Sequence, residues 1–301
     1  MSIKNVNIVF HMAATVNFIE KLRIATAINV RGTLESLLLA KEMLNLKTMI
    51  YVSTAYAHCI YSDIDEKFYD TPISSDELMQ LTNILNDDQL DALLPHLLGK
   101  WPNTYVFTKA IAENLVKTVG KDLPIAIVRP SIKPIVGWIN NYYGIVGVTL
   151  GSAIGLIHTL PCDPDVIVDL VPADYCVNMI LAAAWDAGKR KKNPAGKSSV
   201  DPNDIISDDI SIYNYVGSVQ KPITYRKYMS DIKEVAMTMP SEHCISYFIL
   251  LMCKNKYIYL LAVIFLHLLP AYIMTFFCWI SGSKLRYVNK SFSIYTYNNI
   301  E

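Results

Sequence analysis

Three short apolar runs alternate with long helical patterns in the first 130 residues, and this alternation constrains the fold more than any other feature of the sequence. The runs cover residues 7–14, 49–55 and 125–129, and each has the length and β-branching of a buried parallel strand. Helical periodicity occupies residues 18–46 and 104–119, where apolar positions recur three and four apart. Because strand, helix and strand in this order build right-handed parallel units, we predict an α/β fold with a partial Rossmann-type sheet flanked by helices.

The remaining segments extend this pattern and divide the chain. Between the second and third runs, a polar, proline-punctuated segment is expected to hold one short helix at residues 75–94. A helix at residues 172–185 closes a first domain at residues 1–186. Residues 187–210 are predicted to be a linker or surface loop, since they are charged and poor in aromatic residues. Residues 211–301 form a C-terminal region that starts with a strand at 212–216 and a helix at 225–237.

An apolar segment at residues 257–280 changes the class of protein to be considered. It has no formally charged side chain and is long enough to cross a hydrocarbon core of about 30 Å. Pro270 and His267 oppose spanning, because proline removes a backbone hydrogen bond and imidazole is costly in lipid. Two readings stay open: a spanning or deeply interfacial membrane segment, or an apolar hairpin packed on the soluble part. Basic residues flank it on both sides and leave its topology open: Lys254, Lys256, Lys284 and Arg286.

Charge and ligand patterns exclude several classes of function. The 27 basic and 27 acidic residues balance, so no field of one sign attracts nucleic acid, and we expect no nucleic-acid partner. The six cysteines form no CxxC pair, and no signal core opens the sequence, which predicts reduced thiols on the cytosolic side. The six histidines lack the spacing of zinc ligands, so no metal site is expected.

A tyrosine and a lysine stand four residues apart at the start of the second predicted helix. Tyr105 and Lys109 therefore project from one helix face. A phenol with a pKa near 10 is a poor acid at neutral pH, and a neighbouring ammonium favours its phenolate and makes proton transfer easier. The pair predicts a general acid with its electrostatic partner; alone, the same spacing also fits an ordinary surface pair.

Two hydroxyls support the catalytic reading of this pair. Ser53 and Thr54 end the second predicted strand, at the edge where α/β sheets present ligands and catalytic groups. A hydroxyl there can hydrogen-bond a substrate carbonyl beside Tyr105, although such residues also serve as plain turns or caps. The order is hydroxyl at a strand end, YxxxK on a helix, and then a strand that ends in Arg129 and Pro130. This order as a whole is stronger support for a catalytic site than the YxxxK spacing or the strand-end hydroxyls alone.

This arrangement resembles the extended short-chain dehydrogenase/reductases, and the words around it resemble the fatty acyl-CoA reductases of insects and other eukaryotes. The likeness covers most of the chain from Asn5. The resembling words are VFHMAATV at residues 9–16, NVRGT at 29–33, YVSTAYA at 51–57, RPSI at 129–132, GW at 137–138, DLVPAD at 169–174 and HLLPA at 267–271.

The resemblance implies a role for each matching residue. Tyr105 would be the general acid, Lys109 its partner and ribose ligand, and Thr54 with Ser53 the carbonyl-orienting hydroxyls. Asn29 would support the lysine through water. The residues implied to lie along the cofactor are Ala13, Ala14, Tyr105, Lys109, Arg129, Pro130, Ser131 and Ile132. No role is assigned to His11 or His58, since a histidine beside such motifs is more often structural.

The implied activity is reduction of a long-chain acyl-CoA by NADPH to an aldehyde and then to a primary alcohol. Membrane lipid is the further expected partner. We expect membrane localisation with the catalytic part facing the cytosol, and the endoplasmic reticulum and the peroxisome as candidate organelles.

The sequence departs from the family pattern in two places. No GxxGxxG turn precedes Asn5, so we expect the chain to lack the glycine-rich first unit that holds the pyrophosphate and to leave an apolar sheet face uncovered. The stretch at residues 130–138 is also shorter than the family pattern. A catalytically silent, membrane-associated remnant of such a reductase therefore stays open as an alternative. A sugar-nucleotide epimerase or dehydratase ranks last, because those enzymes lack an apolar tail like that of this chain.

Overall fold

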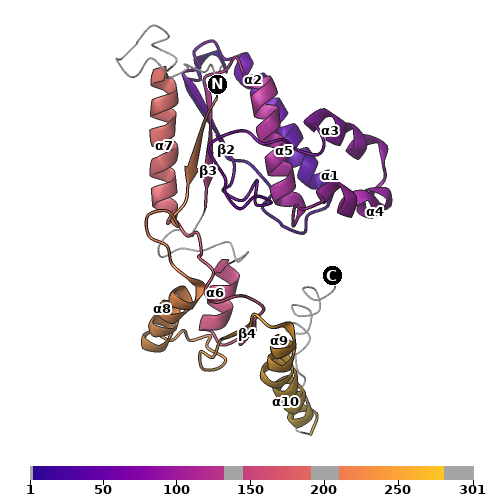
Figure 1. Ribbon diagram of the computed structural model, residues 1–301, viewed down its shortest axis with the longest axis vertical. Helices are drawn as coiled ribbons and strands as arrows, with labels where there is room; N and C mark the ends of the chain where they lie inside the picture. The colour runs from indigo at the N-terminus through magenta and orange to yellow at the C-terminus, as the bar shows by residue number, and fades with distance from the viewer. Residues whose placement is uncertain (1–2, 132–144, 191–209, 281–301) are drawn as a thin grey trace. The chain divides into compact units, whose positions relative to one another are not determined.

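A computed structural model describes residues 3–131, 145–190 and 210–280 and divides the chain into two compact units (Figure 1). The first unit comprises Met1–Ile139 and Asp169–Gln220, and the second comprises Asn140–Val168 and Lys221–Glu301. This division differs from the predicted boundaries at residues 186 and 211. The last strand of the main sheet comes from the segment assigned to the C-terminal region, while residues 145–168 pack with that region.

The first unit is built on a four-stranded parallel sheet, which confirms the predicted fold class. The strand order is β1-β2-β3-β5, and each of the three neighbouring pairs is parallel. All four carboxyl ends therefore meet at one edge of the sheet. The strands are β1 (Ile8–His11), β2 (Thr48–Val52), β3 (Ile125–Pro130) and β5 (Ser211–Tyr215).

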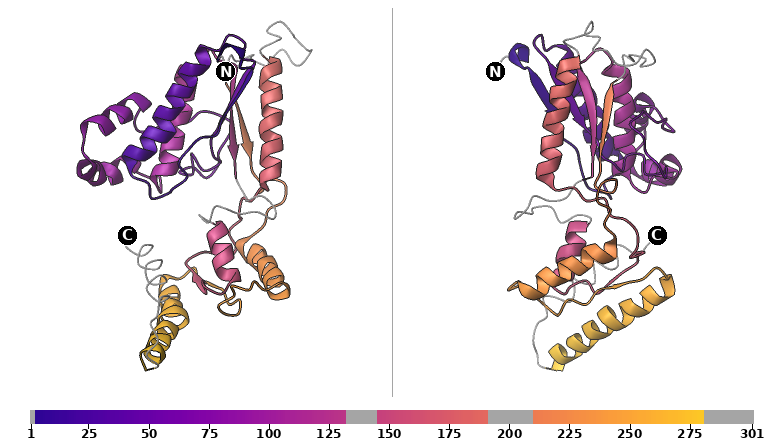
Figure 2. Two further views of the ribbon diagram at one scale, coloured as in Figure 1. Left: turned by 180° about the vertical axis from the view of Figure 1, so that it is seen from behind. Right: turned by 60° about the vertical axis from the view of Figure 1, so that its left-hand side comes forward.

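Helices cover both faces of this sheet (Figure 2). Helices α2 and α5 lie against one face and α7 against the other, as the alternation of buried side chains along β2 requires. Met49 and Tyr51 point to the α5 side, whereas Ile50 and Val52 pack under α7. The helices of this unit are η1 (Ile3–Asn5), α1 (Leu22–Ala25), the π-helix η2 (Thr26–Arg31), α2 (Gly32–Lys41), α3 (Ser75–Ile84), α4 (Asp87–Leu98), α5 (Thr104–Val119) and α7 (Ala173–Arg190).

Two helical predictions differ from the structure in their details. The helix predicted at residues 18–46 begins at Leu22 and contains the π-helical turn η2. The single helix predicted at residues 75–94 is two helices, because each has its own capping box. Ser74 and Glu77 cap α3, and Asn86 and Gln89 cap α4.

Strand β1 is one of the two edge strands of the sheet in the described structure, and two of its apolar side chains are exposed. Ile8 is 49% exposed and Phe10 is 39% exposed. The inner strands β2 and β3 are buried at every position. Parallel sheets normally bury both faces, so the exposed apolar side chains of β1 depart from that pattern.

The second unit is small and mainly helical, with one short parallel pair between β4 and β6. Gly155 has φ 72° and lies so close to the Ser246 backbone that a Cβ there would clash. That contact joins the α6 end to the segment before β6. The elements are α6 (Ile145–Ala153), β4 (Thr159–Leu160), α8 (Tyr225–Thr238), β6 (Leu251–Met252), α9 (Lys256–Val263), the π-helix η3 (Ile264–Leu268) and α10 (Leu269–Ile280).

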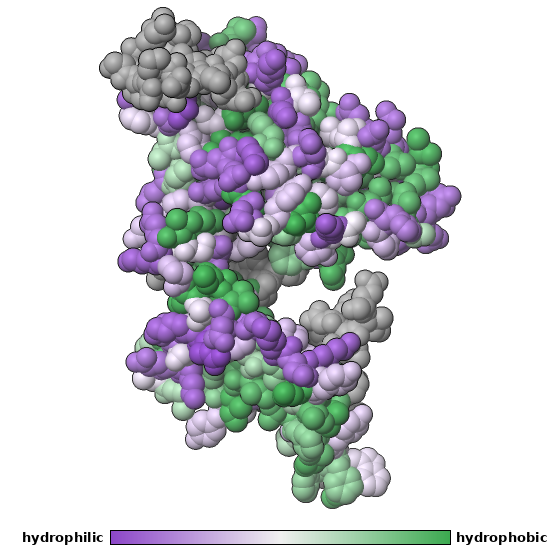
Figure 3. All heavy atoms as spheres, viewed as in Figure 1, coloured by the Kyte–Doolittle hydropathy of each residue, from purple (hydrophilic) through white to green (hydrophobic). Residues whose placement is uncertain are grey.

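The last three elements form one helical stretch that matches the predicted apolar segment. Residues Lys256–Phe277 have a mean hydropathy of 2.2 over their most apolar window, and they are long and apolar enough to cross a membrane. Tyr259, Ala262 and Val263 are buried, whereas nearly all of α10 is exposed, and Figure 3 shows the hydrophobic surface that results. The stretch is therefore docked on the second unit along part of α9 and bare along α10.

Candidate active site

Helix α5 begins at the carboxyl edge of the sheet, and a side-chain cap fixes its first turn. The Asn103 side chain accepts a hydrogen bond from the Val106 N–H at 3.1 Å, and the Thr104 hydroxyl donates to the Glu20 carbonyl at 2.9 Å. Tyr105 lies in this capped turn and Lys109 one turn later. The cap therefore places both predicted groups at the edge where the strands end.

Tyr105 lies beside a hydroxyl and an aromatic ring. The Phe18 ring lies 5.5 Å from the Tyr105 ring between centroids. Burial raises the pKa of Tyr105, and the neighbouring Thr54 hydroxyl opposes that shift. The structure thus brings together the predicted acid and one of the two predicted hydroxyls.

Lys109 is buried at this site, and its side chain contacts β2. Its Nζ donates to the Val52 carbonyl at 2.7 Å and lies 4.3 Å from the centre of the Tyr51 ring. Burial lowers the pKa of Lys109 to about 7, against the favourable charge of Glu113. The ammonium and the amine therefore exchange near neutral pH, as a group that assists proton transfer requires.

His11, to which the sequence assigned no role, ends β1 beside this lysine. Its pKa is lowered to about 4, first by burial and then by the charge of Lys109. The Thr33 hydroxyl donates to the Asn29 carbonyl at 2.7 Å, so it accepts from His11 Nε2 at 3.0 Å. His11 is therefore a neutral, hydrogen-bonded neighbour of the site.

Ser53 is directed away from Tyr105 and into a buried ionic cluster. Its hydroxyl donates to Glu113 at 2.5 Å, on the α5 side of the sheet. His58 Nε2 lies 2.9 Å from the same carboxylate, and Arg129 donates to both of its oxygens, at 3.0 and 2.6 Å. The Ser53 hydroxyl is thus engaged with Glu113, and the carbonyl-orienting role of Ser53 and Thr54 stays a prediction.

Arg129, which the resemblance placed along the cofactor, is wholly occupied by contacts within the protein. Besides Glu113, it donates to the carbonyls of Asp65 and Lys67, each at 2.9 Å, and to the Asn214 side chain at 3.4 Å. Its side chain is 0% exposed. Its guanidinium therefore joins β3 to the segment that follows β2. Only the backbone of Arg129 is left for the predicted contact with the cofactor near the end of β3.

Asn29 lies in η2, one helix away from the pair. Its Oδ1 accepts from the Thr15 N–H at 2.9 Å, and its Nδ2 donates to the Thr108 hydroxyl at 3.0 Å. These contacts bind the segment after β1 to α5 next to Lys109. They place Asn29 against Thr108, which directly precedes Lys109 in the sequence. The support of Lys109 by Asn29 through water stays a prediction.

The other predicted cofactor residues lie at the ends of β1 and β3. Ala13 is exposed and Ala14 is partly exposed. The Pro130 carbonyl accepts from the Ala55 N–H at 3.1 Å, which extends the sheet. Ser131 is buried, and its hydroxyl has no hydrogen-bond partner among the described residues. Ile132 and the predicted short stretch at 130–138 lie, from residue 132 on, outside the described residues.

These residues fit a nicotinamide cofactor in their chemistry. Lys109 has three N–H donors, and the Val52 carbonyl takes one of them, so two can serve ribose hydroxyls. The exposed Ala13 leaves room beside the end of β1, and the unpartnered Ser131 hydroxyl offers a further polar contact.

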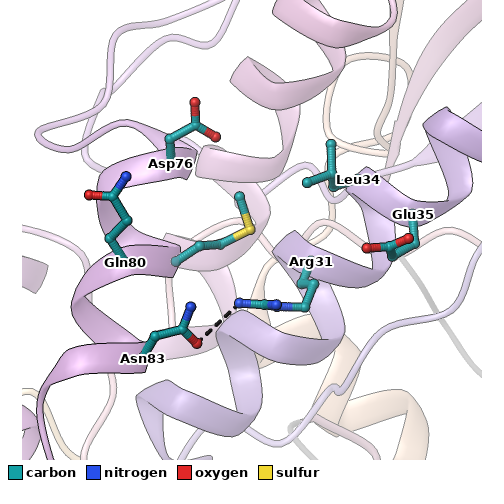
Figure 4. A pocket seen from close by; sticks show the side chains of 7 residues that line it. Arg31, Leu34, Glu35, Asp76, Gln80 and Asn83 are labelled. Atoms are coloured by element: carbon teal, nitrogen blue, oxygen red, sulfur yellow. Dashed lines mark hydrogen bonds between the residues drawn. The ribbon is translucent and has the colours of Figure 1, made fainter.

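A separate hollow of about 280 Å³ lies between α3 and the η2–α2 stretch (Figure 4). Arg31 donates to the Asn83 side chain at 3.1 Å across it. None of its lining residues belongs to the Tyr105 site. They are Arg31, Leu34, Glu35, Asp76, Met79, Gln80 and Asn83.

Comparison with known proteins now places the chain. The family described as Male sterility protein matches residues 1–180. A Drosophila melanogaster protein named fatty acyl-CoA reductase wat is 38% identical over 303 residues, which cover 99% of this chain and 56% of the relative. The chain belongs to the fatty acyl-CoA reductase family. Human fatty acyl-CoA reductase 1 is 43% identical over 192 residues, covering 62% of this chain and 37% of that protein.

Solved structures show the same fold for this chain. A UDP-glucuronic acid 4-epimerase from Bacillus cereus in complex with NAD aligns with a TM-score of 0.51 at 16% identity, covering 84% of this chain and 65% of that one. A thiolation-reductase di-domain from an archaeal non-ribosomal peptide synthetase aligns with a TM-score of 0.50 at 16% identity, covering 82% and 55%. The chain spans about half the length of the curated relatives it matches.

Sequence reasoning missed Glu113, the centre of the buried cluster. A signal was present, because Glu113 follows Lys109 by four residues, as Lys109 follows Tyr105. Three polar residues at this spacing occupy one face of a helix that is otherwise largely buried. Such a stripe predicts partnered, buried charge.

Proposed function

We propose that this chain reduces long-chain fatty acyl-CoA to fatty alcohol through an aldehyde, with NADPH as reductant and Tyr105 as general acid. The observation that carries the proposal is the grouping at the carboxyl edge of the sheet. There the Tyr105 phenol lies beside the Thr54 hydroxyl, and Lys109 lies one helical turn away with its ammonium buried. Family membership supplies the substrate class, since the relatives are named fatty acyl-CoA reductases.

The residues of this site would stabilise oxygen as it gains charge. Thr54 orients the thioester carbonyl toward Tyr105, and the phenol gives its proton to the oxyanion that forms when the carbonyl carbon accepts hydride. The hydroxyl of the hemithioacetal so formed then returns its proton to Tyr105 as the carbon–sulfur bond breaks, coenzyme A leaves as a thiolate that is protonated by water, and an aldehyde is formed. A second hydride, which a second NADPH would supply, and the proton that Tyr105 has regained give the alcohol, after which water reprotonates Tyr105.

Lys109 makes this proton transfer easier while holding the reductant. Its ammonium favours the phenolate left on Tyr105, and its remaining N–H donors bind the ribose. NADPH supplies the hydride when bound. Ala13, Ala14 and the backbone of residues 129–131 are the part of the chain proposed to line it.

We further propose that α10 brings the chain to a membrane, as its exposed apolar surface supports. The continuous stretch Lys256–Phe277 is long and apolar enough to cross a membrane. Within it Tyr259, Ala262 and Val263 pack on the second unit, whereas most other side chains of α9 are exposed. We propose a spanning or deeply interfacial segment, with the catalytic part on the cytosolic side.

The deciding experiment combines cofactor binding and turnover. The chain in detergent is titrated with NADPH by fluorescence quenching, and alcohol formation from a long acyl-CoA is followed by chromatography. We expect saturable binding, with turnover lost in Tyr105→Phe and kept in Tyr247→Phe, whose phenol is 78% exposed in the second unit. No binding at millimolar NADPH would refute the proposal and support the silent, membrane-associated alternative.

A further inference from the structure

One acidic side chain in the core of the first unit has more polar contacts than packing requires. The Glu113 side chain is 1% exposed, and its two carboxylate oxygens meet Ser53, His58 and Arg129. These partners come from the end of β2, the segment after it and the end of β3. The carboxylate therefore fixes to α5 the chain segments that deliver Thr54 and the end of β3.

The same carboxylate lies one helical turn from the lysine of the site. Residues four apart on a helix have Cβ atoms about 5–6 Å from each other, so Glu113 and Lys109 are neighbours on one face. Both are buried, and the interior of a protein screens their attraction less than water does. The position of Glu113 thus couples the ionic cluster to the reacting pair.

We propose that Glu113 is a positioning residue of the Tyr105–Lys109 pair: its charge holds Lys109 in the ammonium form, and its hydrogen bonds hold β2 and β3 against α5. The inference deepens the proposed function and rests on it for its catalytic meaning. Glu113 contacts neither substrate nor cofactor in this assignment.

The charge balance around Lys109 supports this assignment. Burial is the main influence that lowers the pKa of Lys109, and the Glu113 carboxylate acts in the opposite direction. His11 faces the lysine from β1, Tyr51 from β2 and Tyr105 from α5, and the buried polar side chains of η2 and α2 carry no charge. Glu113 is the anion in this set.

Arg129 sets how far this charge can act. Its guanidinium neutralises part of the carboxylate, yet the pKa of Glu113 is lowered by the His58 and Arg129 contacts against the cost of burial. The carboxylate therefore stays ionised across the range in which Lys109 titrates. A lasting negative charge beside a lysine with a pKa of about 7 is what keeps the ammonium populated at neutral pH.

The test follows the ionisation of Lys109 itself in the full chain. The side-chain ¹³Cε resonance of Lys109, assigned with Lys109→Arg, is titrated by NMR in the parent protein, in Glu113→Gln and in Glu113→Asp. We expect the midpoint to fall in Glu113→Gln and to be kept in Glu113→Asp, which retains the charge. Above the midpoint, each unit of downward movement lowers the ammonium fraction about tenfold.

A matched control separates this charge effect from damage to the cluster. His58→Asn removes a contact to the same carboxylate and leaves its charge, so we expect lower stability and an unchanged Lys109 midpoint. If Glu113→Gln does not fold, Glu113→Gln/Arg129→Gln removes both opposite charges and carries the same measurement. An unchanged midpoint in the folded Glu113 variant would overturn the proposal.

The kinetic readout distinguishes failure of this inference from failure of the proposed function. With turnover, the alkaline limb of the kcat profile should move to lower pH in Glu113→Gln, with little change in KM. Without NADPH binding, the Lys109 titration still decides the charge assignment. A shifted midpoint with no turnover would uphold the role of Glu113 and refute the reductase.

Discussion

Helix α5 and the α9–α10 stretch have opposite relations to water. Helix α5 buries a lysine and a glutamate, with the Lys109 and Glu113 residues 3% and 1% exposed. The α9–α10 stretch instead exposes large apolar side chains, with Phe277 61% and Trp279 78% exposed. Both begin with an asparagine cap and both lie against a folded unit. Hydropathy alone therefore fails to predict which side chains of this protein are covered.

The difference teaches that partners decide burial in the first helix and environment decides exposure in the second. Glu113 is stable inside because Ser53, His58 and Arg129 satisfy its oxygens. An all-round apolar helix such as α10 has no equivalent partners in the described structure, and lipid is the environment that we propose for it. Removing a partner of a buried charge in α5 should therefore lower the free energy of unfolding. Removing apolar surface from α10 should instead weaken binding to lipid.

The largest expected effect comes from leaving one charge of α5's cluster unpaired. Glu113→Leu should lower the free energy of unfolding by about 3–5 kcal/mol, because Arg129 stays buried without its carboxylate. Urea unfolding measures the loss. The double variant Glu113→Leu/Arg129→Met should recover part of it, and a single variant that costs under about 1 kcal/mol would break the argument from partners.

A second prediction concerns acid and the histidine next to Lys109. The pKa of His11 is about 4 in the folded chain, against 6.5 ordinarily. The unfolded chain therefore takes up this proton first as pH falls, and stability is lost between pH 6.5 and about 4, by up to about 3 kcal/mol. Urea unfolding across this range should show a smaller loss in His11→Asn than in the parent. His243→Asn, on an exposed histidine, should keep the parental slope.

The third prediction tests the exposed side of the comparison. Phe277→Asp should weaken binding to phospholipid vesicles by about 2 kcal/mol, about 30-fold, while leaving the free energy of unfolding unchanged. Flotation with liposomes measures the first and urea unfolding the second. Val219→Asp, on an exposed apolar residue of the first unit, should not alter flotation. Equal flotation of both variants would refute the membrane surface on α10.

The smallest expected effects come from the two asparagine caps. Asn103→Ala should cost about 1 kcal/mol of stability and loosen the first turn of α5, where Tyr105 lies. Asn255→Ala should loosen α9 by a similar amount, since its Oδ1 accepts from Tyr257 and Ile258. Hydrogen exchange of each first turn measures both. Only the first variant should lower turnover, and loss of turnover in the second would contradict the comparison.

The parallel fold could be predicted from the sequence because β2 and β3 are buried on both faces. Such strands read as continuous apolar runs, and the helix at 104–119 has an unbroken period between an asparagine cap and a glycine. The break between α3 and α4 was missed, although Asn86 and Gln89 form a capping box. Cap chemistry is local and readable, whereas the period of apolar residues continues through the break.

The grouping of Tyr105, Lys109 and Thr54 could be predicted from motif order, but the direction of Ser53 could not. A shift of one residue along an extended chain moves a side chain to the opposite face, so adjacent hydroxyls serve different sites. The pairing of Glu113 with Arg129 depends on how β3 sits beside β2, which no local pattern states. Long-range register is thus the part that only the structure supplies.

The Glu113 cluster also has a consequence for the order of folding events. Ser53 and Glu113 are 60 residues apart in the chain, and Arg129 reaches Asn214, 85 residues away. Contacts of such separation close large loops, so we expect them to form after the local helices and near the end of the folding reaction. Substitutions here should therefore speed unfolding far more than they slow folding. We therefore expect the cluster to form late in folding and to control the unfolding rate of the sheet.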